Sequence, residues 1–300
     1  MLWLFITISA YFLFAITALL DKYLLLGPPN PKIYSFYVGI LSASALLLIP
    51  FVGFSIPSLS YIVLSLTAGA LFIGALFVLY TGLERFEASR IISAIGGILP
   101  LFTFILVLLS GERQELSFLR ILAFLFLISG SVLITFKKEK SVTLKSLSLS
   151  ALAAFLFSLS FILTKFVYLS QPFWSGFIWM RIGGFLAALC FIFTPEVRKE
   201  IFTQKSSFKK KTGALFLFNQ AIGSVAFVLQ NWAIALVPLG FLTFITALEG
   251  TKYVFLLILT ILASSRFPTL LKEEFSKSAI RQKLLAILLI IAGLVLSNFP

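Results

Sequence analysis

The chain has 300 residues, of which 60% are hydrophobic and 12% are charged, and its 24 Lys and Arg against 11 Asp and Glu give a formal net charge of +13. Soluble domains carry charge on about a quarter of their residues, so this composition excludes an ordinary soluble domain. Histidine is absent and Cys190 is the single cysteine, which excludes imidazole metal ligands, histidine-based nucleophile pairs and a disulfide framework. We therefore expect neither a cofactor nor a metal site.

Ten apolar runs follow one another along the chain, each near the roughly 20 residues that cross about 30 Å of hydrocarbon as a helix. The predicted spans are residues 2–25, 33–53, 59–82, 88–110, 118–137, 146–169, 172–194, 212–236, 239–264 and 281–299. Backbone polar groups inside a bilayer must bond within their own segment, so all ten are predicted to be helices. The predicted fold class is an all-α integral membrane protein with ten transmembrane helices.

The sequence repeats itself, with five predicted spans in each half. Near the start of each half the matches are Ala10 with Ala153, Phe12 with Phe155, Leu13 with Leu156, Phe14 with Phe157, Leu20 with Leu163 and Lys22 with Lys165. Near the ends they include Leu122 with Leu285, Ala123 with Ala286, Gly130 with Gly293 and Phe136 with Phe299. A unit with five crossings leaves on the opposite side of the membrane. We therefore expect two inverted five-helix repeats, 1–140 and 141–300, which are typical of alternating-access transporters.

Basic residues gather in the loops after odd-numbered spans. The densest groups are Lys137, Lys138, Lys140 and Lys145; Arg198, Lys199, Lys205, Lys209, Lys210 and Lys211; and Arg266, Lys272, Lys277, Arg281 and Lys283. The even-numbered loops offer Arg113 and Arg120 alone. By the positive-inside rule, the odd loops face the cytoplasm and both termini lie outside, in a cytoplasmic (inner) membrane. The net charge thus reports topology, and we expect the lipid bilayer rather than nucleic acid as a partner.

The order of small motifs in the first half resembles a known family. The sequence runs through Tyr80-Thr81-Gly82-Leu83, Ala88-Ser89, Gly96-Gly97, Pro100, Gly111-Glu112-Arg113 and Gly130. This order resembles the EamA-like domain of the drug/metabolite transporter superfamily, whose members carry two such domains and ten helices. The resemblance implies export or exchange of small metabolites. Two features depart from the family: the Gly-Glu-Arg turn is missing from the second half, and family members usually keep both termini in the cytoplasm.

Three charged residues fall in the middle of predicted spans in the second half. Arg181 lies midway along 172–194, and Glu249 and Lys252 share a face of 239–264. Charges inside a bilayer usually face a water-filled cavity or a partner. In one interpretation, Arg181 and Lys252 anchor a carboxylate or phosphate, while Glu249 binds a cationic group or exchanges a proton. In the other, Glu249 forms a structural ion pair with Lys252 or Arg181.

Neutral polar and aromatic residues extend this candidate substrate site. Asn219 and Gln230 fall within a narrow arc with Gly223, because eleven residues make almost three helical turns. They are candidate hydrogen-bonding groups for the substrate, and Trp179 and Tyr253 are candidate cavity residues.

Two further features of the spans bear on transport. The fourth span is interrupted by Gly96, Gly97 and Pro100, and the ninth by Glu249-Gly250-Thr251; matched breaks point to the site, with close packing through small residues as the alternative. Lys22 and Lys165, which the repeat pairs, are candidate gate residues. For Lys165 the alternative is that its side chain snorkels to the membrane interface.

The sequence as a whole predicts a secondary transporter, an exporter or exchanger of a small polar metabolite that is amino-acid-like or anionic. It carries no nucleotide-binding loop, and proton coupling through Glu249 and facilitated exchange both stay open. The alternatives are a non-transporting membrane scaffold or sensor, or an intramembrane enzyme. We expect no enzyme, because the usual combination of nucleophile and base, or a metal, is missing.

Overall fold

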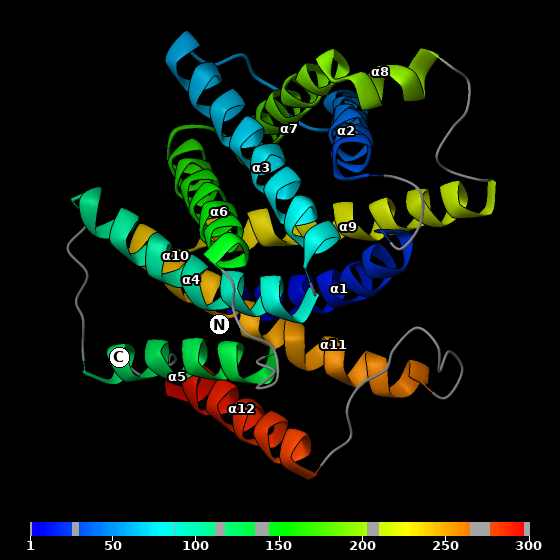
Figure 1. Cartoon of the computed structure of the whole chain (residues 1–300). Helices are drawn as coiled ribbons and strands as arrows, with labels where there is room; N and C mark the ends of the chain where they lie inside the picture. The colour runs from blue at the N-terminus through cyan, green and yellow to red at the C-terminus, as the bar shows by residue number, and fades with distance from the viewer. Residues whose placement is uncertain are drawn as a thin grey trace.

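The chain is built from helices that cross one another in several directions (Figure 1). The computed structural model describes residues 2–25, 30–86, 88–111, 118–135, 144–202, 210–264 and 277–296, and these ranges contain no strand. Seven helical segments within them are long and apolar enough to cross a membrane. The predicted all-helical class is thus confirmed, and the seven segments are compatible with a multi-pass membrane protein.

The membrane-length segments overlap seven of the predicted spans. They are Leu2–Asp21, Pro31–Phe51, Leu59–Arg85, Leu144–Ser170, Phe173–Phe193, Thr212–Leu236 and Leu239–Leu256. They lie in α1 (Leu2–Leu25), α2 (Pro31–Leu41) with η1 (Ser42–Phe51), α3 (Leu59–Arg85), α6 (Leu144–Ser170), α7 (Phe173–Leu189) with η2 (Cys190–Phe193), α9 (Lys210–Leu236), and η3 (Leu239–Phe241) with α10 (Leu242–Ala247) and α11 (Glu249–Ser264). The shorter apolar stretches belong to α4 (Ala88–Leu109), α5 (Phe118–Thr135) and α12 (Lys277–Leu296).

Local sequence explains where some helices begin and end. Asn30 caps α2, because its Oδ1 accepts a hydrogen bond from the Ile33 N–H at 3.0 Å. Pro31 follows in the first turn, where its missing N–H costs no helical hydrogen bond. After α4, Gly111 has a φ of +82°, a left-handed conformation that glycine adopts without steric cost.

A short helix, α8 (Pro195–Phe202), lies in a segment where the sequence predicts a loop between two spans. It is joined to the start of α2 by an ion pair between Lys32 and Glu196, with Nζ and Oε1 2.7 Å apart. Because Lys32 donates this hydrogen bond, the pKa of Glu196 lies below its ordinary value. The pair therefore links α8 to α2, and like other surface ion pairs it contributes little to the stability of the fold.

The two expected helix breaks have different outcomes. The ninth span is broken at Leu248, which separates α10 from α11, whereas the expected interrupting residues Glu249-Gly250-Thr251 form the start of α11. In contrast, α4 continues without interruption through Pro100 and the two glycines before it, so the expected interruption is absent. Proline removes one backbone donor, but neighbouring helices can support the backbone of a membrane helix past it. The carbonyl that loses its helical donor is that of Gly96; beside it, the Ser158 hydroxyl of α6 donates to the Leu99 carbonyl at 2.9 Å and ties α6 to α4.

At one edge of the bundle, α5 and α12 lie side by side (Figure 1). A Cβ added to Gly130 would lie 2.8 Å from the Ala286 carbonyl oxygen, and one added to Gly293 would lie 2.9 Å from that of Ala123. These contacts are reciprocal, because the sequence repeat matches Gly130 with Gly293 and Ala123 with Ala286. Residue numbers rise along one helix as they fall along the other, so α5 and α12 are antiparallel.

Glycines also allow α3 and α7 to approach closely. A Cβ on Gly69 of α3 would lie 1.8 Å from the Met180 carbonyl oxygen, and one on Gly183 of α7 would lie 2.2 Å from the Leu66 carbonyl oxygen. Both distances are far inside van der Waals contact with backbone atoms. Neither position can accept a side chain unless the two helices move apart.

We predict that Gly69→Ala lowers the apparent melting temperature of the purified protein by several degrees, because overpacking costs about 1–3 kcal/mol. Gly74→Ala is the matched control, since Gly74 lies on the same helix with nothing within 4 Å of its added Cβ. It should leave the melting temperature unchanged or slightly higher, because alanine favours the helix. Thermal unfolding in a single detergent tests this, and equal melting temperatures for the two variants would contradict the packing argument.

Candidate functional site

One face of α9 meets α1 inside the bundle. Asn219 on α9 donates to Asp21 on α1, with Nδ2 and Oδ1 2.6 Å apart. One turn further along α9, Gly223 faces the Thr17 methyl group, so the two helices are antiparallel. Gln230 lies almost three turns beyond Asn219 on the same face, and both side chains are buried. The arc that the sequence predicts therefore faces inward.

Arg181 of α7 points toward the same face of α9. Its guanidinium carbon lies 4.9 Å from the centroid of the Phe227 ring, a cation–π arrangement. Among the residues that the structure describes, no carboxylate lies within 4 Å of this guanidinium and no group is hydrogen-bonded to it. Arg181 is thus a cation in the bundle interior that is covered by an aromatic ring rather than neutralised by an acid.

A small cavity adjoins Arg181 where α3, α6, α7 and α9 meet. Its volume is about 10 Å³, which is room for roughly one water molecule. It is lined by Ala68, Gly69, Phe72, Ile73, Ser160, Thr164, Met180, Arg181, Gly184 and Phe227. This cavity is therefore too small to hold a metabolite in this conformation.

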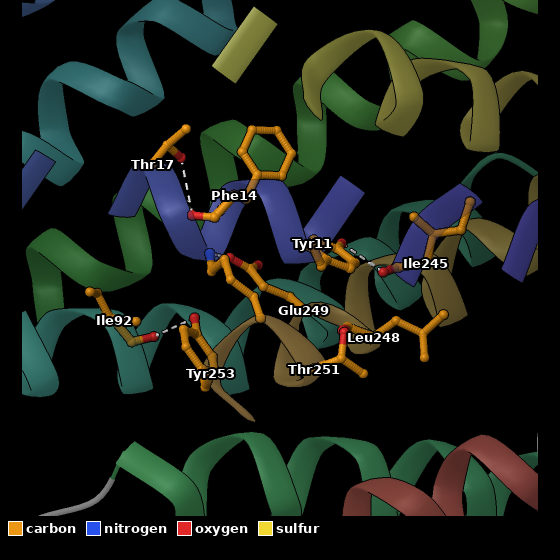
Figure 2. Close-up of polar contacts among 10 residues, drawn as sticks. Tyr11, Phe14, Thr17, Ile92, Ile245, Leu248, Glu249, Thr251 and Tyr253 are labelled. Carbon is orange, nitrogen blue, oxygen red and sulfur yellow. Dashed lines mark hydrogen bonds and ion pairs between the residues drawn. The ribbon is translucent and has the colours of Figure 1, made fainter. Parts of the chain in front are cut away.

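Glu249 and Lys252 form an ion pair at the start of α11. Their side chains are 14% and 18% exposed, so the pair is largely withdrawn from solvent. Figure 2 shows Glu249 between Tyr11 of α1 and Tyr253 of its own helix. For these two charged residues the geometry matches the ion-pair alternative, with Lys252 rather than Arg181 as the partner of the acid.

Two buried tyrosine hydroxyls hold the segments around this ion pair (Figure 2). Tyr11 of α1 donates to the Ile245 carbonyl of α10 at 2.8 Å, and Tyr253 of α11 donates to the Ile92 carbonyl of α4 at 3.1 Å. The broken segment, with its break at Leu248, is thus tied to α1 before the break and to α4 after it. Tyr253 is 3% exposed and acts as a structural donor in this conformation.

Arg181 and the ion pair approach α9 on neighbouring turns. Phe227 covers Arg181. Gln230, three residues later, lies beside Tyr11, which in turn neighbours Glu249 of the ion pair. Three residues of helix rise about 4.5 Å, so the two clusters flank the same part of α9. This part of α9 is the candidate functional site.

Two predicted site residues lie away from this point. The indole nitrogen of Trp179 donates to the Ser55 carbonyl at 3.4 Å, and its ring stacks on Phe54 at 5.9 Å, in the segment before α3. Asn219 lies eleven residues before Gln230, or about 16 Å along the helix. The structure therefore groups Arg181, Gln230 and the ion pair, and leaves Trp179 and Asn219 in other surroundings.

Lys165 is buried rather than snorkelling, which corrects one of the two alternatives for this residue. It is 3% exposed, and its Nζ donates to the Ala235 carbonyl at 3.1 Å. Ala235 lies in the last turn of α9, where carbonyls have no helical partner and the helix dipole favours a cation. A nearby acceptor therefore removes the need to reach the interface. The side chain of Lys22, the other candidate gate residue, lies outside the described residues.

Sequence reasoning did not place Asp21 or Tyr11 in the interior network. Asp21 could have been found, because it is an acid at the end of an apolar span. Tyr11 carries no comparable signal, since tyrosine also suits lipid-facing and interfacial positions. The roles of both residues depend on contacts of α1 with α9 and α10, through Asn219 and the Ile245 carbonyl.

Comparison with known proteins supports the arrangement of the helices. No protein-family model and no curated protein matches the sequence. Among solved structures, 26 chains match. One of them, named "Crystal structure of protein", is 17% identical with a TM-score of 0.69, over 98% of this chain and 97% of that chain. At this identity the likeness concerns the fold alone, and it extends over almost the whole length of both chains.

We predict that Lys252→Met lowers the melting temperature, because it leaves the Glu249 carboxylate largely buried without a cation. The loss should be smaller than the roughly 3–5 kcal/mol typical of fully buried pairs, since both groups are partly exposed. The double variant Glu249→Gln/Lys252→Met should recover most of the lost stability, because it removes both charges together. Thermal unfolding of the three proteins tests this; a double variant no more stable than Lys252→Met would refute the pair's role.

Proposed function

We propose that the chain is a secondary transporter, an exporter or exchanger, that moves a small anionic metabolite by alternating access. The observation that carries this proposal is Arg181, a guanidinium in the bundle interior without an acidic partner among the described residues. A charge within a membrane segment is costly to retain, and such residues usually serve a substrate or ion pathway. Guanidinium groups bind carboxylate or phosphate through two parallel hydrogen bonds, so the partner that Arg181 lacks is an anion.

The charge balance beside α9 favours an anion over a zwitterion. At the part of α9 that carries Phe227 and Gln230, Glu249 and Lys252 neutralise each other, which leaves the positive charge of Arg181 as the net charge there among the described residues. An amino acid would bring an ammonium group that needs a free carboxylate, and Glu249 could supply one only by releasing Lys252. Carboxylates and phosphates without an ammonium group are therefore the preferred substrate class.

Helix contacts support the proposal that ten membrane helices form two inverted five-helix repeats. Thr17 of α1 faces Gly223 of α9, and Ser160, its counterpart on α6, donates to the Ala68 carbonyl of α3 at 2.9 Å. The antiparallel pair of α5 and α12 also makes reciprocal contacts at matched positions. A two-fold axis in the membrane plane relates helices in this way, as inverted repeats require.

The small size of the cavity fits one stage of an alternating-access cycle. Small-molecule sites usually enclose about 300–1,000 Å³, whereas the space at Arg181 is about 10 Å³. We propose that this is an occluded conformation, and that the site opens when α7 or α9 moves relative to its neighbours. Motion of one repeat against the other would supply that opening on either side of the membrane.

The proposal also agrees with the resemblance of the sequence to EamA-like transporters, which export or exchange small metabolites. A membrane sensor and an intramembrane enzyme are the alternatives. The first would bind an anion without moving it, and the second would convert it chemically. The experiment below distinguishes all three.

We predict that anions stabilise the protein through Arg181. Inorganic phosphate and a panel of small mono- and dicarboxylates should be added to the purified protein, and the melting temperature measured. A bound anion raises the melting temperature by mass action, by several degrees at concentrations about 100 times its dissociation constant. The rise should disappear in Arg181→Gln, which keeps a polar side chain but removes the charge.

The control for this experiment is Arg198→Gln, which removes an equal charge from α8 and should respond like the natural protein. The stabilising anion is then tested for uptake and efflux in vesicles, which Arg181→Gln should abolish. Binding without flux would indicate a sensor, and a converted product would indicate an enzyme. An equal response of Arg181→Gln and the natural protein would overturn the proposed site.

We also predict that the two repeats label from opposite sides of the membrane. In a Cys190→Ser background, Ser58→Cys follows the second predicted span and should react with an impermeant maleimide from outside. Phe202→Cys follows the seventh, the corresponding position in the second repeat, and should react from the cytoplasmic side alone. Both residues are exposed. Labelling of both variants from one side would contradict the inverted arrangement.

A further inference from the structure

A second charged group lies inside the bundle at the other end of the inward face of α9. Asp21 of α1 accepts hydrogen bonds on Oδ1 from the Tyr34 hydroxyl and from Nδ2 of Asn219, the latter at 2.6 Å. Tyr34 is fully buried and Asn219 is 1% exposed. The Tyr34 ring packs edge-on against Tyr80 and Phe216, with centroids 4.8 and 5.3 Å away. The carboxylate therefore sits in a pocket of aromatic rings with two donors of fixed position.

No cation balances Asp21 among the described residues. The groups that face it are Tyr34 from α2, Tyr80 from α3 and Asn219 from α9, none of which carries a charge. Lys22, the next residue along the chain, has a side chain outside the described residues. A carboxylate in such surroundings is held by hydrogen bonds alone, while its desolvation favours the neutral acid. Hydrogen bonds thus stabilise the charged form of Asp21, whereas desolvation stabilises its neutral form.

The side-chain amide of Asn219 gives independent evidence that this site can hold Asp21 in two protonation states. Its Oδ1 is buried and has no hydrogen-bond partner, although its Nδ2 donates to Asp21. A buried amide oxygen without a partner is costly. If Asp21 gains a proton, its new O–H can donate to that oxygen after the amide rotates, because the two ends of an amide differ only in donor and acceptor character. Asn219 can therefore stabilise either protonation state of its neighbour.

We propose that Asp21, Tyr34 and Asn219 form a proton-binding site that couples transport to a proton gradient. The Asp21 carboxylate takes up one proton from the aqueous phase on one side, becomes the neutral acid, and returns the proton on the other side. This role rests on the transport function proposed above. It moves proton exchange away from Glu249, because a proton on Glu249 would leave Lys252 an unpaired cation in the bundle.

The inward face of α9 connects this site to Arg181. Asn219 contacts the proton site and Phe227 covers the guanidinium, eight residues and about 12 Å further along the helix. A change in the hydrogen bond between Asp21 and Asn219 alters the packing of α1 on α9 at one end. Because α9 is one continuous helix, that change is carried to the ring that covers the anion site.

Infrared difference spectroscopy of the protein in lipid bilayers tests the site without a substrate. As the pH is raised between about 4 and 9, the range over which perturbed carboxyls titrate, a protonated carboxyl band should be lost. The band should be missing in Asp21→Asn and retained in the matched control Glu249→Gln, which removes the carboxylate of the ion pair. A band unchanged in Asp21→Asn would overturn the proposal.

A second variant tests the site even if Asp21→Asn fails to fold. Tyr34→Phe removes one donor from the charged form, so the midpoint of the band should move to higher pH by about one unit. An unchanged midpoint would overturn the site. The titration is repeated with sodium replacing choline; a midpoint that sodium shifts would show a metal-cation site instead and would also overturn it. Failure here leaves anion binding at Arg181 untouched, because neither measurement involves an anion.

Discussion

The cost of holding a charge in a hydrocarbon layer organises the interior of this protein. Four ionic sites within the bundle meet that cost differently. Glu249 has Lys252, Lys165 has a carbonyl at the end of α9, Arg181 has an aromatic ring, and Asp21 has a hydroxyl and an amide. The ion pair is neutral, whereas Lys165, Arg181 and Asp21 have no counterion among the described residues. Of these three, Lys165 is held by a carbonyl in the last turn of α9, where the helix dipole favours a cation. Function is therefore sought at Arg181 and Asp21.

The helix α9 brings these groups into one system. Its inward face meets α1 through Asn219 and Gln230, and it meets α7 through Phe227. Its last turn holds Lys165 of α6. The helix thus contacts Asp21, Arg181 and Lys165 directly and reaches the Glu249–Lys252 pair through Tyr11 of α1. Movement of α9 would therefore change the surroundings of the anion site and the proton site together, which is the physical requirement for coupling the two.

Apolar length and helical period explain how much of this structure the sequence predicts. They identify the helical class and the arc of Asn219 and Gln230 on α9, and they place an interruption within one residue of the break at Leu248, because these depend on residues close together in the chain. They do not identify partners across helices, because a period gives the direction of a side chain but not the helix that it meets. This is why Trp179, a candidate cavity residue in the sequence, instead donates to Ser55, and why Asp21 was missed. It is also why the sequence left open that the Lys165 side chain reaches the membrane interface, whereas its Nζ binds a carbonyl at the end of α9.

The reciprocal contact of α5 with α12 bears on how such a chain could arise. Gly130 meets the backbone at Ala286 while Gly293 meets it at Ala123, so one kind of surface is used on both sides. Two identical polypeptides make contacts of this form across a two-fold axis when they associate as a homodimer. A separate ancestor half the present length could thus have paired through this surface before gene duplication and fusion joined the two copies. Fusion would then have kept an old subunit interface as an internal seam.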